Sequence, residues 1–336
     1  MPCLSRRAVL ALPLASPALV PALAPALVQA QGSAWRPTQQ VRIICPAAAG
    51  GTADMMARLL GQHLTQAWGQ TAVVDNRSGA GGIIGTQEFL RQPADGHTIL
   101  SGNIGPQAIA YSLYRNMPYT PARFAPVAGS VRGPNVLVVH PSVPAQTVLE
   151  FVAHLKANPG RLAYGSPGIG QSGHLTSVWF SQLTGTEAIH IPFRGAGPAA
   201  IELVAGNIQF MWDNLSSGIE QIRGGRVRAI AVSSTERNPQ LPDIPTARET
   251  MAELAQFEVN TWFGKFYPAG TPAHIVQALN EEMRILAESP SFRQRVEQIG
   301  SVSLWGTPEQ FSNFVTGEIT KWRGVIQREG LQMEVS

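Results

Sequence analysis

The chain has 336 residues, of which 44% are hydrophobic, and its formal net charge is +3. Its three lysines are scattered and its arginines form no stripe with interleaved aromatic residues, so we expect no nucleic-acid partner. Without its first 30 residues the chain keeps one cysteine, Cys45, which excludes an intramolecular disulfide. Residues 31–336 exceed the length that one hydrophobic core usually serves, so we expect two lobes.

The N-terminus has the pattern of an export signal. Arg6 and Arg7 precede an uncharged stretch, and Val28 and Ala30 supply small residues at the −3 and −1 positions of a cleavage site. A membrane anchor is the alternative, but four prolines in the stretch would leave backbone groups that lipid cannot satisfy. We therefore expect cleavage near Ala30 and a periplasmic location. The paired arginines favour the twin-arginine route, with general secretion left open.

Strand and helix signals alternate along the chain, which predicts an α/β protein with mostly parallel sheets. A β-rich run ends at Pro46, and apolar residues then recur with a helical period from Ala53 to Trp68. In chain order we predict strands at 41–45, 71–74, 98–101, 136–140, 162–165, 188–192, 208–212 and 227–233. The predicted helices are 53–68, 147–157, 174–184, 197–205, 216–223, 272–287, 290–299 and 307–328.

The two lobes are expected to share the chain more than once, because no low-complexity linker or internal repeat follows residue 37. The extended segments near 131–136 and 257–263 are the predicted crossings. Lobe 1 then comprises residues 35–131 and 258–336, and lobe 2 comprises residues 132–257. Paired strands at the crossings would form a hinge.

Three glycine-rich loops, at 46–52, 165–173 and 193–197, each lie between a predicted strand and a predicted helix. Glycines allow the backbone to approach a ligand, and the following helix N-terminus offers unpaired N–H groups and a positive dipole end. In open α/β sheets, ligands lie at this end of the strands. Several such loops at one cleft would hold an anion without a lysine or arginine.

One of these loops supports a competing interpretation. Gly168, Gly170 and Gly173 match the dinucleotide-binding fingerprint, so an exported NAD(P)-dependent oxidoreductase stays the alternative function. The acidic residue expected at the end of the next strand is missing, since Glu187 precedes that strand and Arg194 follows it. The seven histidines have no metal-ligand spacing and no acid–base pair is evident. We expect no cofactor, no metal and no catalysis.

Several longer segments resemble one receptor family. They are 41–54 (VRIICPAAAGGTAD), 74–82 (VDNRSGAGG), 94–100 (ADGHTIL), 190–195 (HIPFRG), 211–214 (MWDN) and 241–246 (LPDIPT). They are similar to Bug-type, or TctC-like, receptors, the solute-binding components of tripartite tricarboxylate transporters. The resemblance implies a type II periplasmic-binding-protein fold, with two α/β lobes joined by a hinge and closing on a small carboxylate. It also implies a monomer whose partner is a membrane permease, with a sensor kinase as the alternative partner.

The resemblance implies that backbone amides and small hydroxyls hold the ligand. Carried over onto this sequence, the binding residues are Ala48, Ala49, Gly50, Gly51, Thr52, Asp54 and Asn103 in lobe 1, and Ser166, Gly168, Gly170, Gln171, Ser172, Phe193, Arg194, Gly195 and Asp213 in lobe 2.

Two loops depart from the family pattern. Residues 47–49 are alanines where a phenylalanine and prolines are usual, and Ile104, Pro106 and Ile169 replace small or polar residues. Fewer polar side chains and more apolar surface favour a ligand with a substantial hydrocarbon or aromatic part.

Overall fold

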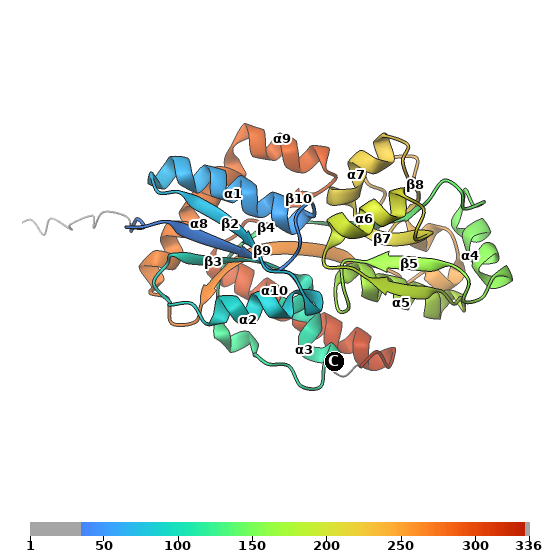
Figure 1. Cartoon of the computed structure of the whole chain (residues 1–336), viewed down its shortest axis with the longest axis horizontal. Coiled ribbons are helices and arrows are strands. Elements are labelled where there is room, and N and C mark those ends of the chain that lie inside the picture. The colour runs from blue at the N-terminus through green and yellow to red at the C-terminus, as the bar shows by residue number, and fades with distance from the viewer. Residues whose placement is uncertain (1–34, 333–336) are drawn as a thin grey trace, which may run out of the picture. The chain divides into compact units, whose positions relative to one another are not determined.

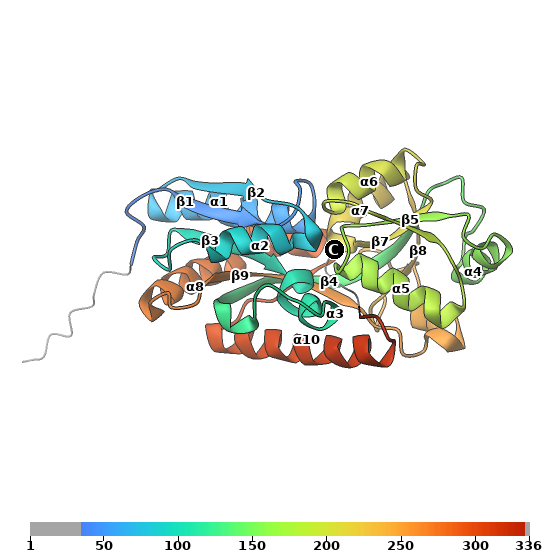
Figure 2. The same ribbon diagram turned by 60° about the horizontal axis from the view of Figure 1, so that its bottom comes forward.

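The computed structural model describes residues 35–332. The predicted export signal and its cleavage site lie outside these residues. Within this range, no helix is long and apolar enough to cross a membrane. The described part contains one mixed sheet with helices on both faces (Figures 1 and 2).

One half of the fold, here called lobe 1, is built on three parallel strands. β1 pairs with β2 on one side and with β3 on the other. Met56, Leu60 and Leu64 recur at four-residue spacing on α1 and are buried in the core beside this sheet. The elements of lobe 1 are β1 (Val41–Cys45), α1 (Thr52–Trp68), β2 (Ala72–Asn76), α2 (Ile83–Leu90), β3 (Thr98–Asn103), α3 (Ala110–Leu113), α8 (Ala273–Glu288), α9 (Pro290–Gln298), β10 (Val302–Ser303) and α10 (Pro308–Arg328).

The other half, lobe 2, follows the same strand–helix plan. β5 pairs in parallel with β6 and with β7, and helices connect these strands. The Thr147 hydroxyl caps α4 by accepting the Glu150 N–H at 3.2 Å. The elements of lobe 2 are α4 (Val148–Ala157), β5 (Ala163–Ser166), α5 (Ser172–Thr184), β6 (Ile189–Pro192), α6 (Ala196–Val204), β7 (Phe210–Asn214), α7 (Leu215–Arg223) and β8 (Arg228–Val232).

Two long antiparallel strands join the lobes. β4 (Phe124–Val139) pairs with β9 (Asn260–Pro268) along its first part, and then with β7 and β8 from Asn135 or Val136 onward. The strand order β2-β1-β3-β9-β4-β7-β5-β6 therefore runs through both lobes. The two crossings expected near 131–136 and 257–263 lie within or beside these strands, while the lobe bounds themselves stay a prediction.

The prediction of mostly parallel sheets is wrong at the centre of the molecule. β9 is antiparallel to β3 and β4, and β4 is antiparallel to β7 and β8. The physical reason is the return of the chain: after lobe 2 is complete, β9 runs back along β4 into lobe 1. The sequence patterns also missed β9, the first half of β4, α2 and α3. Pro126, Gly129 and Gly133 weaken the strand pattern of β4, and register shifts follow two of these residues.

A single long helix reinforces this connection. α10 packs on β4 and α3, and Figure 2 shows it lying below both. Beyond its end, the carbonyl of Glu329 accepts a hydrogen bond from Nε2 of Gln182 on α5 at 3.1 Å. The helix starts with a capping box in which Thr307 and Gln310 satisfy each other's backbone N–H groups. Residues of both lobes and of α10 share one hydrophobic cluster.

Replacing Gly264 of β9 with alanine is expected to destabilise the protein by about 1–3 kcal/mol, because overpacking a filled core forces neighbouring groups to move. A methyl group there would lie 2.1 Å from the Cζ atom of Phe311 on α10. Gly317→Ala on the exposed face of α10 is the control, since a methyl group there meets nothing within 4 Å. Urea unfolding of the two variants tests this, and equal stability would contradict the tight packing at Gly264.

Candidate ligand-binding site

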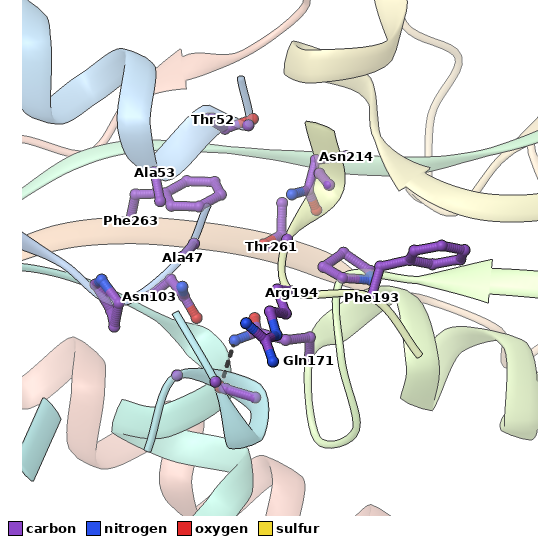
Figure 3. Close-up of a pocket in the computed structure, with 18 of the residues that line it drawn as sticks. Ala47, Thr52, Ala53, Asn103, Gln171, Phe193, Arg194, Asn214, Thr261 and Phe263 are labelled. Carbon is purple, nitrogen blue, oxygen red and sulfur yellow. Dashed lines mark hydrogen bonds between the residues drawn. The ribbon is translucent and has the colours of Figure 1, made fainter. Parts of the chain in front are cut away.

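A pocket lies between the two lobes, at the carboxyl ends of the parallel strands (Figure 3). Both lobes and the connecting strand β9 contribute to its wall. Its lining residues are Pro46, Ala47, Gly51, Thr52, Ala53, Gly79, Ala80, Gly81, Gly82, Asn103, Pro167, Gln171, Phe193, Arg194, Gly195, Ala196, Asn214, Thr261 and Phe263.

Four helices begin at the pocket. The residues that precede their first turns are Gly51 for α1, Gln171 for α5, Gly195 for α6 and Asn214 for α7, and all four line the pocket. None of these residues caps its helix with a side-chain hydrogen bond. The first-turn N–H groups therefore remain available to a bound anion, and the positive ends of four helix dipoles meet at one place.

Direct contacts close the pocket between the lobes. The Ala48 N–H donates to the Arg194 carbonyl at 2.9 Å, and the hydroxyls of Thr52 and Ser216 are 2.7 Å apart. Nε2 of Gln171 donates to the Gly81 carbonyl at 2.6 Å, as the dashed line in Figure 3 shows. Glycine is required at this last contact, because a methyl group at Gly81 would lie 2.1 Å from the Ile169 carbonyl oxygen.

Seven of the sixteen predicted binding residues line the pocket. The other nine lie behind its wall or outside it. The lining residues are Gly51, Thr52, Asn103, Gln171, Phe193, Arg194 and Gly195, and the remaining ones are Ala48, Ala49, Gly50, Asp54, Ser166, Gly168, Gly170, Ser172 and Asp213. Ala49 and Gly50 line a separate, more open hollow that also borders Phe193.

Asp54 stabilises the first glycine loop. Its carboxylate accepts hydrogen bonds from the Gly50 N–H at 3.2 Å, from Arg58 at 3.0 Å and from Asn76 at 3.0 Å. Burial alone would raise the pKa of Asp54, but these hydrogen bonds and the Arg58 charge hold it below its usual range. The carboxylate is thus fully engaged in holding the turn that leads into α1.

Two stacked histidines shape the 166–173 loop from behind. The Ser166 hydroxyl lies 2.7 Å from Nε2 of His190 and accepts the Gly168 N–H, and the Gly170 N–H donates to Nδ1 of His174. The two imidazole rings stack with centroids 4.4 Å apart. Burial lowers the pKa of His174 to about 3 and of His190 to about 4, so both rings are neutral at pH 7. The amides of Gly168 and Gly170 are consequently used within the loop.

Ser172 and Asp213 both form hydrogen bonds with Asn214, which lines the pocket. The Ser172 hydroxyl donates to Oδ1 of Asn214 at 3.2 Å. The Asp213 carboxylate accepts the Asn214 N–H at 2.8 Å and the Ser217 hydroxyl at 3.1 Å. Burial without a positively charged partner raises the pKa of Asp213 to about 7.

The sequence reasoning missed several lining residues. Asn214, Thr261 and Phe263 are the main ones, and Figure 3 shows Asn214 beside Thr261 on one side of the pocket. A signal exists for Asn214, because it lies between the predicted strand 208–212 and the predicted helix 216–223. No comparable signal exists for the other two, which belong to β9 and lie in the segment 257–263 that the sequence predicts as a crossing. Of the residues that depart from the family pattern, only Ala47 lines the pocket.

Arg194 supplies the positive side chain at the pocket. It is exposed, and among residues 35–332 its guanidinium has no ion pair. Figure 3 shows it next to Gln171, at the place where the lobes meet. Because the guanidinium is solvated at the rim, it offers a charge to an entering anion without a large desolvation cost.

The sequence model of the tripartite tricarboxylate transporter family receptor matches residues 56–331. The chain belongs to this family. The receptor is 36% identical over 291 residues to the UPF0065 protein in the tcbD-tcbE intergenic region of Pseudomonas sp. strain P51, covering 86% of both chains. It is 33% identical over 302 residues to BugT of Bordetella pertussis, covering 89% of this chain and 91% of that one.

Solved structures show the same fold. Rpa4515 of R. palustris with adipate is 34% identical with a TM-score of 0.84, over 88% of this receptor and 98% of that chain. MatC of Rhodopseudomonas palustris with bound malate is 30% identical with a TM-score of 0.82, over 86% and 99% of the two chains. These findings confirm the resemblance to Bug-type receptors and the two-lobed periplasmic-binding-protein fold, and they favour a receptor over an oxidoreductase.

Replacing Asp213 with asparagine is expected to flatten the pH dependence of stability. The folded-state pKa of about 7 lies above the unfolded value, so the protonated carboxyl stabilises the fold below about pH 4. That contribution is lost as pH rises to about 7. The free energy of unfolding of Asp213→Asn relative to the natural protein should therefore increase by about 2–4 kcal/mol between pH 4 and pH 8.

Urea unfolding at the two pH values measures this difference. Asp243→Asn is the matched control, because Asp243 is exposed. A pH dependence that is the same in Asp213→Asn and the natural protein would show that the buried carboxyl does not titrate in this range.

Proposed function

We propose that this receptor captures a small dicarboxylate in the periplasm by closure of its two lobes and presents it to a membrane permease. The observation that carries the proposal is the convergence of four uncapped helix N-termini on one pocket. Related receptors solved with adipate and with malate agree with an acid of this class. Presentation to a permease follows from the family, and a sensor kinase is the alternative partner.

Two carboxylates fit this pocket better than one. The N-terminus of α1 lies on the lobe 1 wall, whereas those of α5, α6 and α7 lie on the lobe 2 wall. An acid with a carboxylate at each end would engage both walls and would therefore stabilise the closed arrangement. Ala47, Ala53 and Phe263 offer apolar surface to the hydrocarbon between the carboxylates.

The binding residues in this proposal are those that line the pocket. Asn214 and Thr261 add polar groups to the seven predicted residues that are already there. The nine others, including Asp54, Ser166 and Asp213, act indirectly by holding the loops and Asn214 in place. We also propose that the protein is exported, is cleaved near Ala30, acts as a monomer and catalyses no reaction on its ligand.

Thermal-shift measurements on the purified mature protein test the ligand class. Malate and adipate are expected to raise the melting temperature, because each can place a carboxylate at both walls. Citrate is expected to have a smaller effect, since the pocket offers apolar surface between the two walls. Saturable binding of NADP would instead favour the oxidoreductase alternative. Recovery of the bound acid unchanged, measured by NMR, tests the absence of turnover.

Arg194→Gln is expected to weaken dicarboxylate binding about tenfold, because it removes a charge that is solvated at the rim of the pocket. The dependence of Kd on salt should also become shallower. Arg248→Gln is the matched control, as Arg248 is exposed on lobe 2 and does not line the pocket. Calorimetry at two salt concentrations measures both effects, and an unchanged Kd would remove Arg194 from the site.

A further inference from the structure

Lys265 is a fully buried lysine without a counter-charge. It lies on β9, and its side chain is completely inaccessible to solvent. Nζ donates to the Ser101 hydroxyl at 2.6 Å, and among residues 35–332 the ammonium group forms no ion pair. A buried ammonium group is costly unless a carboxylate or several hydrogen bonds compensate it, so its presence calls for an explanation.

The position of Lys265 places it directly behind the ligand pocket. Ser101 and Asn103 of β3 are paired with Lys265 and Phe263 of β9. Because alternate residues of a strand share a face, Ser101 and Lys265 lie on the same face as Asn103 and Phe263, which line the pocket.

A hydrogen-bonded chain connects the lysine with the helix that begins at the pocket. Nζ of Lys265 donates to Ser101, and the Ser101 hydroxyl donates to the carbonyl of Ala53 at 3.2 Å. Ala53 lies in the first turn of α1 and lines the pocket, where Figure 3 shows it beside Phe263. The amine is therefore one layer of side chains away from the lobe 1 wall.

The surrounding groups do not neutralise an ammonium at this position. β1 contributes Cys45, whose pKa is raised by burial to about 11, and β9 itself contributes Tyr267, whose pKa burial also raises. The carboxylate of Asp54 on α1 is already paired with Arg58. The neighbouring residue on β4 is Ala128. Burial accordingly lowers the pKa of Lys265 to about 7.

We propose that Lys265 couples ligand capture to proton uptake: a dicarboxylate bound at the lobe 1 wall supplies the missing counter-charge and draws a proton onto the buried amine. This inference rests on the proposed function. Lys265 acts as a positioning residue that senses ligand charge through the wall, without touching the ligand. It makes the receptor favour dicarboxylates over monocarboxylates, and it makes the affinity depend on pH in a range where these acids are already ionised.

The direction of the pH effect follows from linkage. Below the pKa of Lys265 in the ligand-free protein, the amine is protonated before and after binding, so Kd is constant. As pH rises above that value, binding has to recruit a proton, and Kd increases until the amine stays neutral in both states. A ligand-induced rise of one pKa unit corresponds to about a tenfold change in Kd.

Isothermal titration calorimetry with adipate and with malate, in two buffers of different ionisation enthalpy at pH 7.5, counts the protons taken up. The natural protein is expected to take up a substantial fraction of one proton and to bind about tenfold more weakly at pH 9 than at pH 6. Lys265→Met, which matches the length of the buried chain, should show neither effect. Lys321→Met is the matched control, because Lys321 is exposed on α10, and this variant should retain both effects.

The possible outcomes separate this inference from the proposed function. Binding of either acid without proton uptake by the natural protein, or equal uptake by Lys265→Met, would overturn the role of Lys265 and leave the receptor function intact. Failure of the natural protein to bind either acid would overturn both. The measurement on the natural protein does not depend on whether the variant folds.

Discussion

The pairing of β4 with β9 is the constraint on which the rest of the structure depends. β4 continues from one lobe into the other, and its register with β9 extends from Phe124 and Pro268 to Pro134 and Asn260, where the pairing with lobe 2 begins. The lobes can therefore change their mutual orientation only by bending these two strands, so the carboxyl ends of both parallel sheets stay opposed. The pocket forms at those ends, and β9 itself supplies Thr261 and Phe263 to its wall.

The electrostatics of the site are unusual in using few charged side chains. Four helix N-termini contribute partial positive charge, Arg194 contributes a solvated charge at the rim, and the Lys265 amine is buried behind the wall. Nearby acidic groups do not cancel this field: Asp54 is held by Arg58 and Asn76. Asp213 is shielded in lobe 2, where burial favours its neutral form. In the proposed function, a carboxylate is therefore recognised mainly by oriented backbone groups.

The sequence predicted the parts of the fold that periodicity controls. α1 corresponds to the helical period of residues 53–68, and β1 to the β-rich run that ends at Pro46. The three glycine-rich loops lie where helices begin at the pocket. β9 was missed because Gly264 and Lys265 interrupt an apolar run. The buried lysine finds its hydrogen-bond acceptor on a partner strand, β3, which places Ser101 opposite it. That partnership depends on residues 164 positions apart, which no local pattern reveals.

The same limit explains why the site was predicted only in part. The three predicted loops each contribute residues that line the pocket, but whether an amide faces the pocket or its own loop depends on distant side chains. The Gly168 N–H donates to the Ser166 hydroxyl, which lies 2.7 Å from Nε2 of His190, and the Gly170 N–H donates to Nδ1 of His174. Asn214 enters the pocket because Ser172 and Asp213, on two different elements, hold it there. Such roles require the tertiary structure.

Closure and anion selectivity have a common origin in this arrangement. Bringing the N-termini of α1, α5, α6 and α7 together places like partial charges near one another, which opposes closure. The three hydrogen bonds described between the lobe walls at the pocket are each worth about 1 kcal/mol, so together they favour the closed state only modestly. An anion between the walls converts the repulsion into attraction, so its affinity for the closed state exceeds that for an open one. A neutral solute of the same shape would leave the repulsion in place, and selectivity therefore arises from closure itself.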